Sequence, residues 1–254
     1  MITKAELKGI SSLLNKKFRE EQRKFLVEGE KFVLEALNSN WNCEIIICTK
    51  DYSESEPKQF QNISEKVNRV EIVSPKDFAK VQSTVNSQGI VGVFQKKIIN
   101  SNLGFKSNLI VALENINDPG NAGTIIRTAD WFGITEILLS ETCADVFNPK
   151  TIRASAGSIF HIKIYNEVRF CDKLLELKRN GYKILCADLD GKSIYSYEGK
   201  TKNVIIFCNE ATGPTNALLE IADEKITIPR KGKAESLNVA SASALILSEL
   251  IRNS

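Results

Sequence analysis

Short runs of Ile, Val and Leu alternate along the chain with amphipathic stretches, and this alternation predicts strands followed by helices. In the first part, Leu7, Ile10, Leu14 and Phe18 are spaced for one face of a single helix over residues 4–24, with basic residues between them. Strands are predicted at 25–29, 43–49, 70–74 and 89–95, and helices at 30–39 and from Ser74, an N-cap followed by Pro75. Such an order indicates an α/β layer.

The second part begins after residues 96–107, a polar stretch without periodicity that we interpret as a domain linker. Predicted strands lie at 108–116, 136–140, 161–165, 182–189, 203–209 and 224–229, and predicted helices at 122–133, 149–160, 172–181, 216–223 and 236–253. Continuous apolar strands with helices between them predict a mostly parallel sheet covered on both faces. The pattern therefore divides the chain into α/β domains at 1–98 and 107–254.

Composition narrows the class of protein. Of the 254 residues, 43% are hydrophobic and 26% charged, close to the average of soluble globular chains. No apolar run approaches the roughly 18 residues of a membrane span, and no secretory signal is visible at the start. The net charge of +3 permits a nucleic-acid partner but is too small to require one.

The cysteines and the single histidine limit the chemistry. Six Cys residues form no C-x-x-C pair, and Cys43, Cys48, Cys186 and Cys208 lie in apolar runs, so we interpret them as reduced core residues of a cytoplasmic protein. One histidine, His161, disfavours a metal site, and we expect no metal. The chemistry must come from Arg, Asn, Ser and Glu, or from a cofactor.

Three loops each stand where a predicted strand ends and a helix begins, which is where open α/β sheets bind ligands. In the first, residues 115–123, Asn121 lies near the helix start, and Arg127 follows Gly123 by four residues, about one turn into the helix. There a phosphate or a ribose hydroxyl would meet an amide, free N–H groups and a guanidinium. A capped turn with a solvated arginine is the structural alternative.

The second loop, residues 209–214, puts Glu210 directly after a buried strand. A carboxylate there faces a cleft, or lies favourably near a helix dipole that Thr212 or Thr215 caps. The third loop, residues 228–240, carries three bases in four positions and then small residues. The small residues would allow the backbone to approach a ligand, a helix or a partner subunit closely. The alternative is a basic surface turn before an ordinary packed helix. Neither G-x-G-x-x-G nor G-x-x-x-x-G-K-[ST] occurs.

Taken in order, the three loops resemble the motifs of the SpoU-type (TrmH-type) RNA 2′-O-methyltransferases of the SPOUT superfamily. The matching segments are N-x-G-x-x-x-R at 121–127, N-E-A-T-G at 209–213, I-P at 228–229 and E-S-L-N-V-A at 235–240, with R-A-S-A-G-S at 153–158. This resemblance covers about residues 107–254. The first segment resembles, more loosely, the L30e-like substrate-binding domain that precedes the catalytic domain in many ribosomal RNA methyltransferases.

The resemblance implies a trefoil-knotted α/β domain, S-adenosylmethionine bound in the knot, and an obligate homodimer. General topology rules would have argued against a knot. It implies backbone contacts to the cofactor near Ala187, Asn209, Gly213, Ile228, Pro229 and Leu237. Cys208 departs from the family, in which Gly usually precedes the Asn-Glu pair, and it adds a side chain near the expected cofactor loop.

The implied reaction transfers a methyl group from the sulfonium to a ribose 2′-hydroxyl. By family position Arg127 activates this hydroxyl. Because a guanidinium is a poor base, we expect it to stabilise the developing alkoxide and a nearby phosphate. Asn121 would position the ribose or Arg127, and Glu210 would orient Arg127 or Asn238. Ser236 and Asn238 would organise the substrate and cofactor loops.

RNA contacts are expected in both domains. Arg153, from the same or the partner subunit, would contact a phosphate, and so would Lys16, Arg19 and Arg23 of the first predicted helix. A merely solvated helix face is the alternative for these three. The two-domain layout favours large-subunit (23S) ribosomal RNA as the substrate, with transfer RNA second.

Two other classes of protein remain as alternatives. A non-catalytic RNA-binding dimer is disfavoured by the intact set of Asn121, Arg127, Glu210, Ser236 and Asn238. A dinucleotide-dependent oxidoreductase is disfavoured by the missing phosphate-binding glycines.

Overall fold

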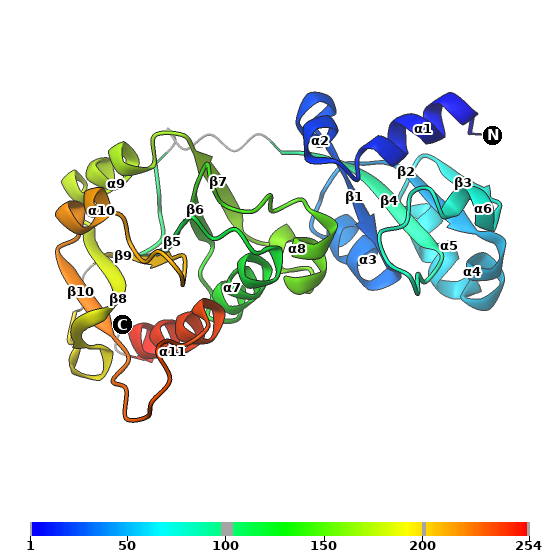
Figure 1. The fold of residues 1–254 in the computed structure, drawn as a ribbon. Coiled ribbons are helices and arrows are strands. Elements are labelled where there is room, and N and C mark those ends of the chain that lie inside the picture. The colour runs from blue at the N-terminus through cyan, green and yellow to red at the C-terminus, as the bar shows by residue number, and fades with distance from the viewer. Residues whose placement is uncertain (1, 98–103, 200–201, 253–254) are drawn as a thin grey trace. The chain divides into compact units, whose positions relative to one another are not determined.

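A computed structural model describes residues 2–97, 104–199 and 202–252, which form two compact units (Figure 1). The first unit combines Met1–Ile98 with Asp145–Phe160, and the second combines Ile99–Ala144 with His161–Ser254. The middle of the predicted linker, residues 98–103, lies outside the described residues. No helix in the described part of the chain combines the length and apolarity that crossing a bilayer requires.

The first unit is built on a four-stranded sheet in the order β1-β4-β2-β3. Its strands are β1 (Lys24–Glu28), β2 (Cys43–Thr49), β3 (Val70–Val73) and β4 (Ile90–Gln95), and its helices are α1 (Lys4–Ser12), α2 (Lys16–Gln22), α3 (Glu30–Asn38), α4 (Lys50–Ser55), α5 (Pro57–Glu65) and α6 (Pro75–Phe78). Only β2 and β3 are parallel, since β4 runs antiparallel to both β1 and β2. Helix α6 has the predicted cap, with Ser74 Oγ accepting from the Asp77 N–H.

The single helix predicted over residues 4–24 is two helices. Helix α1 ends at its C-cap, Leu13, and the Asn15 side chain then caps α2 by accepting from the Lys17 N–H. The apolar spacing continued through this break, so periodicity alone could not show it. Helices α4 and α5 were not predicted, because their sequence is mostly polar; only a few apolar side chains, such as the buried Tyr52 and Ile63, anchor them.

Residues 145–160, which the sequence placed with the second domain, pack on the first unit instead. They contain α8 (Pro149–Ala154) and the short helix η2 (Ser158–Phe160). The Trp41 indole N–H donates to the Phe160 carbonyl over 3.1 Å, and the rings of Phe25 and Phe147 lie 4.5 Å apart. Helix α1 packs on the other face of the sheet, against Leu26 and Ile45. The inserted segment thus covers a sheet face that would otherwise expose aromatic rings.

The second unit has a six-stranded sheet in the order β10-β8-β9-β5-β6-β7, and every neighbouring pair is parallel. Its strands are β5 (Leu109–Glu114), β6 (Glu136–Ser140), β7 (Lys163–Glu167), β8 (Lys183–Ser193), β9 (Asn203–Cys208) and β10 (Glu224–Thr227), and its helices are α7 (Pro119–Trp131), α9 (Phe170–Arg179), η3 (Ile194–Ser196), α10 (Asn216–Ile221) and α11 (Val239–Arg252). The predicted mostly parallel sheet is confirmed. Helices α7 and α11 pack together, as do α9 and α10 on the other side of the sheet (Figure 1).

Arg19 corrects one prediction. Its side chain is 2% exposed, and its guanidinium pairs with the Asp145 carboxylate at 2.7 Å and donates to the Leu13 carbonyl. A base enclosed in this way is not available to a phosphate, so Arg19 is not an RNA contact. Lys16 and Arg23, in contrast, are exposed.

Candidate active site

The site forms at the carboxyl ends of two neighbouring strands at the centre of the second sheet. Glu114, the last residue of β5, lies in register with Cys208, the last residue of β9. The chain turns sharply after β5, where Asn115 has a φ of 56°, and its carbonyl accepts from Asn209 Nδ2 over 3.1 Å. The parallel register therefore brings together two loops that are almost a hundred residues apart in the sequence.

Glu210 is the centre of a hydrogen-bonded cluster that joins all three predicted loops. Its Oε1 accepts from Asn121 Nδ2 at 3.2 Å, from Asn238 Nδ2 at 2.8 Å and from the Val239 backbone N–H at 2.6 Å. Asn238 Nδ2 also lies 3.0 Å from Asn121 Oδ1. Three of the five predicted catalytic residues are thus in direct contact.

Helix caps hold the two asparagines in place. Asp118 caps α7 by accepting from the Asn121 backbone N–H at 2.8 Å, and Asn238 Oδ1 accepts from the Ala240 and Ser241 N–H groups at the start of α11. Each amide side chain is therefore fixed at the first turn of a helix, next to N–H groups that favour negative charge.

A pocket of 570 Å³ adjoins this cluster, between β8 and the loops that follow β9 and β10. Small-molecule sites typically have about 300–1,000 Å³. The predicted cofactor contacts all line this one pocket: Ala187, Asn209, Gly213, Ile228, Pro229 and Leu237. Its wall combines apolar side chains from β8, β10 and α11 with backbone of the two loops, which suits a flat heteroaromatic ring with polar edges.

Cys208 and Asp188 are two of the polar residues that line the pocket. The neighbouring Cys186 thiol and burial raise the pKa of Cys208 above its usual range, so the thiol is protonated at neutral pH. Burial raises the pKa of Asp188, but the Lys225 ammonium at 2.6 Å and the backbone N–H groups of Asp190 and Leu189 together lower it below its usual value. The pocket thus presents a neutral thiol and a compensated carboxylate. Within the described residues, no group of three or more His, Cys, Asp or Glu is arranged to hold a metal ion.

Comparison with known proteins identifies the family. Residues 108–248 match the SpoU rRNA Methylase family. The chain belongs to this family. Residues 4–92 match the MRM3-like substrate binding domain. SpoU methylases are RNA methyltransferases that use S-adenosylmethionine, and the pocket just described has the size and lining for that cofactor.

Several SpoU relatives match over nearly the whole chain. The 23S rRNA (guanosine(2553)-2′-O)-methyltransferase RlmP of Bacillus subtilis is 32% identical over 251 residues, which cover 96% of this chain and 95% of the relative. An AdoMet-bound rRNA methyltransferase from Sinorhizobium meliloti is similar at 29% identity with a TM-score of 0.87, covering 99% of this chain and 96% of that one. A protein from Porphyromonas gingivalis assigned to the TrmH family of RNA methyltransferases is similar at 30% identity, with a TM-score of 0.89 over all of both chains.

The structure does not bring the remaining predicted residues of the SpoU motifs into the Glu210 cluster. Ser236 is exposed and lines the pocket. Arg127 is exposed on α7, and no hydrogen bond or ion pair of its side chain is found among the described residues. Arg153 is half-buried in the first unit and donates to Ser83 Oγ at 2.6 Å.

Two residues of the site went unnoticed in the sequence. Glu114 accepts from the Thr215 hydroxyl at 2.8 Å and so holds the start of α10 against β5, and Asp118 caps α7. A carboxylate that ends an apolar run, and an Asp before Pro at a helix start, were the available signals.

Proposed function

We propose that this protein transfers the methyl group of S-adenosylmethionine to a ribose 2′-hydroxyl of 23S ribosomal RNA. The convergence of Asn121 and Asn238 on one oxygen of Glu210, at the edge of the 570 Å³ pocket, carries this proposal. Relatives that match over the whole length support the substrate class, since one of them is named as a 23S rRNA 2′-O-methyltransferase.

The pocket-lining residues would hold the cofactor, among them Leu237, Ile228 and the loop after β9. When bound, S-adenosylmethionine supplies an electrophilic methyl group. The Glu210 cluster, at the edge of the same pocket, would position the ribose rather than the cofactor. Because Glu210 Oε1 already accepts three N–H groups, it is suited to fix the two asparagines around the ribose rather than to take up a proton.

Arg127 is our choice for stabilising the charge that develops on the attacking oxygen. It lies six residues after Asn121, or about 9 Å further along the helix axis, and helical side chains point back toward the N-terminus. The arginine side chain therefore leans back toward the first turns of α7, where Asn121 lies. Its guanidinium stays protonated and donates in a planar fork, which suits an alkoxide and a neighbouring phosphate.

RNA recognition would use the first unit. The exposed Lys16 and Arg23, together with Arg153, would contact phosphates and so contribute affinity and register. The match of residues 4–92 to a substrate-binding domain supports this division of tasks, with residues 1–98 selecting RNA and residues 107–254 catalysing methyl transfer.

The protein would be cytoplasmic and would form a homodimer through its second unit. That unit would contain the trefoil knot of the SPOUT fold. The exposed side of α11 supports a dimer, because it presents Ser241, Ser248 and the 45% exposed Leu245 at helical spacing. Trp131, at the end of the neighbouring α7, is 84% exposed. Large apolar side chains exposed on two packed helices are typical of a surface that a partner covers.

Mapping of 2′-O-methyl groups in total RNA, with and without the gene, tests this function. We expect one ribose in 23S rRNA to lose its methyl group in the deletion strain, and the purified protein to restore it in the presence of S-adenosylmethionine. If the deletion strain instead lost a methyl group from transfer RNA, the substrate would be transfer RNA and not 23S rRNA. An unchanged map, with no cofactor binding by calorimetry, would instead indicate an RNA-binding dimer without activity.

A further inference from the structure

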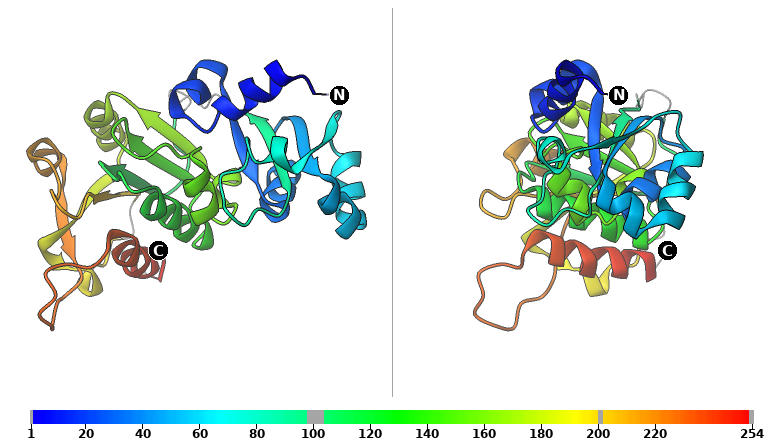
Figure 2. Two further views of the ribbon diagram at one scale, coloured as in Figure 1. Left: turned by 45° about the vertical axis from the view of Figure 1, so that its right-hand side comes forward. Right: turned by 90° about the vertical axis from the view of Figure 1, so that its right-hand side faces the viewer.

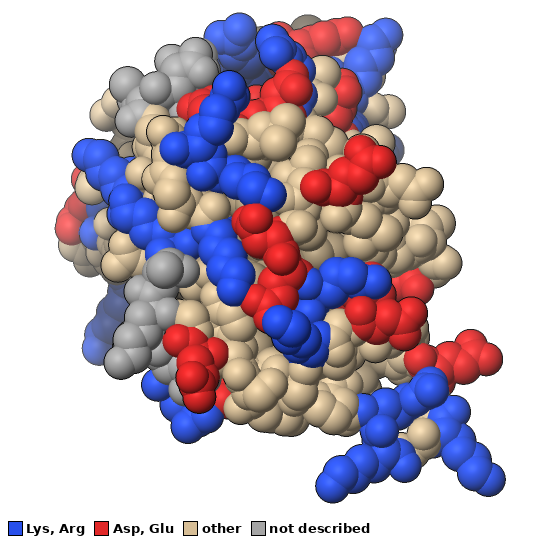
Figure 3. Space-filling model, turned by 90° about the vertical axis from the view of Figure 1, so that its left-hand side faces the viewer, with Lys and Arg blue, Asp and Glu red and all other residues tan. Residues whose placement is uncertain are grey.

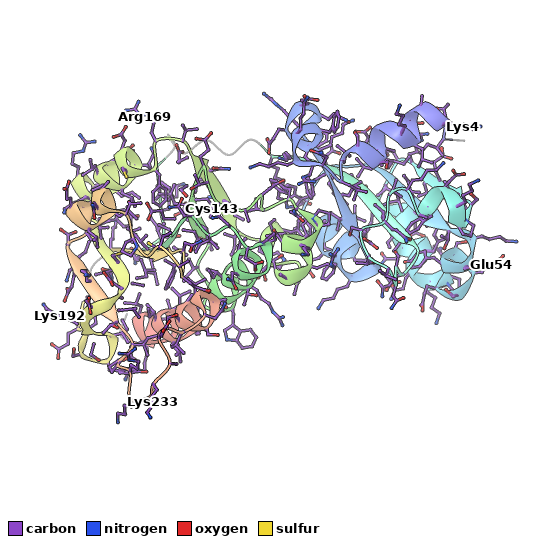
Figure 4. All side chains as sticks on the ribbon, viewed as in Figure 1. Lys4, Glu54, Cys143, Arg169, Lys192 and Lys233 are labelled. Atoms are coloured by element: carbon purple, nitrogen blue, oxygen red, sulfur yellow. The ribbon has the colours of Figure 1, made fainter. Side chains whose placement is uncertain are left out.

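We propose that the loop between β10 and α11 is a basic arm that binds RNA phosphates beside the reacting ribose, with Lys231 and Lys233 as its contacts. The inference rests on the proposed function, which it deepens by assigning a second RNA contact to the catalytic unit. The loop stands out from the body of the second unit in every view (Figures 1 and 2), and Lys233 lies at its tip (Figure 4).

The arm has a defined shape although its residues 229–238 are all exposed. One Arg230 Nη1 donates to the carbonyls of Ala234 and Glu235, at 3.1 and 3.4 Å, and so closes the loop on itself. At its far end, Asn238 is anchored to Glu210. Arg230 thus serves to shape the arm, and the two lysines are left to face outward.

The charge of the arm is not neutralised within the chain. No hydrogen bond or ion pair of the Lys231 and Lys233 side chains is found among the described residues, whereas Lys192, on the neighbouring β8, pairs with Glu224 at 3.1 Å. In Figure 3 a group of Lys and Arg side chains projects from the surface, with acidic side chains beside it. The segment Arg230–Glu235 carries three bases against one acid.

The position of the arm favours RNA over the cofactor as its partner. Lys231 lines the mouth of the pocket, but Lys233 does not, and S-adenosylmethionine carries two cationic groups against one carboxylate. A lysine therefore gains little from the cofactor. Asn238 lies five positions after Lys233, a span of at most about 18 Å. RNA, with one phosphate per nucleotide, places negative charge throughout that radius when its ribose lies at the Glu210 cluster.

The test measures RNA binding as a function of salt, with Lys231→Ala/Lys233→Ala in the full-length protein and a short single-stranded RNA of mixed sequence as probe. Each lost phosphate contact lowers the slope of log K against log [salt] by about 0.7 for a single strand, so we expect a decrease of roughly 1.4. Lys233→Ala alone, at a residue that does not line the pocket, should lower the slope by about 0.7. This single variant should keep the wild-type affinity for S-adenosylmethionine and the wild-type mass in solution. Lys231→Arg/Lys233→Arg should restore the slope.

Lys106→Ala/Lys163→Ala is the matched control, because it removes two exposed lysines of the same unit that do not line the pocket. We expect its slope to equal that of the wild type. An unchanged slope in the arm variant would overturn the proposal, and so would an equal loss in both pairs, or a loss of cofactor affinity or a change of mass in Lys233→Ala. Absence of methyl transfer by a wild-type protein that still binds this RNA would refute the proposed function, while the slopes would still report on the arm.

Discussion

Asn238 donates its side-chain N–H to Glu210 Oε1 over 2.8 Å, and this bond joins the first turn of α11 to the loop after β9. The same asparagine caps α11. Asn238 therefore holds the start of this helix and the Glu210 carboxylate together at the edge of the pocket. A change at either residue therefore affects the arrangement of both loops.

We expect Glu210→Ala and Asn238→Ala to act as one unit. Each variant should lower kcat/KM, and the double variant should lose less than the product of the two losses. Directly bonded residues typically show coupling free energies of about 0.5–3 kcal/mol. A double-mutant cycle on methyl transfer, with melting curves to confirm folding, measures this coupling. Losses that simply multiply would show that the two side chains act independently.

Arg127→Ala should lower turnover without unfolding the protein. The exposed guanidinium is not part of the core that Ile125 and Ile126 form in α7, so the melting temperature and cofactor affinity should stay close to wild type. Loss of one strong donor to a developing oxyanion costs on the order of 10²–10³ in rate. Arg127→Lys should recover little, because an ammonium does not reproduce the planar fork. Turnover within about threefold of wild type would remove Arg127 from the catalytic set.

Arg19 and Lys16 should respond in opposite ways, although both lie on α2. Arg19→Ala leaves the buried Asp145 carboxylate unpaired, and breaking such a pair costs about 3–5 kcal/mol in the free energy of unfolding. Lys16→Ala should leave stability unchanged and weaken RNA binding at low salt. Urea denaturation and RNA titration of both variants separate the two effects. Equal stability of Arg19→Ala and wild type would contradict the structural role.

Glu136 should make stability depend on acid pH. Its buried carboxylate accepts the Lys106 and Ser107 N–H groups at 2.9 and 2.8 Å, and although burial raises its pKa, these bonds lower it below the usual 4.5. The folded state therefore binds fewer protons than the unfolded state, so the stabilisation is complete above pH 4.5 and is lost as the pH falls below it.

Glu136→Gln tests this dependence. Loss of hydrogen bonds to a charged acceptor should lower the free energy of unfolding by about 1–3 kcal/mol at neutral pH. Between neutral and acid pH, the free energy of unfolding should also decrease less for the variant than for the wild type. Parallel stability curves for variant and wild type across the acid range would show that Glu136 does not titrate as described.

Leu245→Glu should separate a dimer into monomers. The substitution places a charge on the exposed side of α11, where burial against a second copy would leave it unpaired. Light scattering at micromolar concentration should give the mass of a dimer for wild type and of a monomer for the variant. Val85→Glu is the control, because Val85 is also an exposed apolar residue, 95% exposed against 45% for Leu245, but lies in the first unit. An active wild-type monomer would contradict the proposed assembly.

The sequence predicted the second unit well because its central strands are buried on both faces, which leaves unbroken apolar runs such as 109–113 and 204–208. Periodicity did not predict the break between α1 and α2, because the Asn15 side chain caps α2 there although the apolar spacing continues. The order of the motifs was enough to propose Asn121, Glu210 and Asn238 together, but their contacts depend on the register of β5 with β9. The burial of Arg19 depends on Asp145, more than a hundred residues away, and no local pattern reports such a pairing.

The packing of residues 145–160 on the first unit changes how the two halves can be separated. The polypeptide passes between the units three times, once in the segment that follows β4 and again on either side of the 145–160 excursion. A single backbone cleavage therefore leaves two covalent connections intact. A fragment that starts at residue 107 would carry Phe147 and Phe160 without the aromatic partners Phe25 and Trp41. A cut at the predicted linker therefore divides the first unit, because its residues 145–160 stay with the C-terminal fragment.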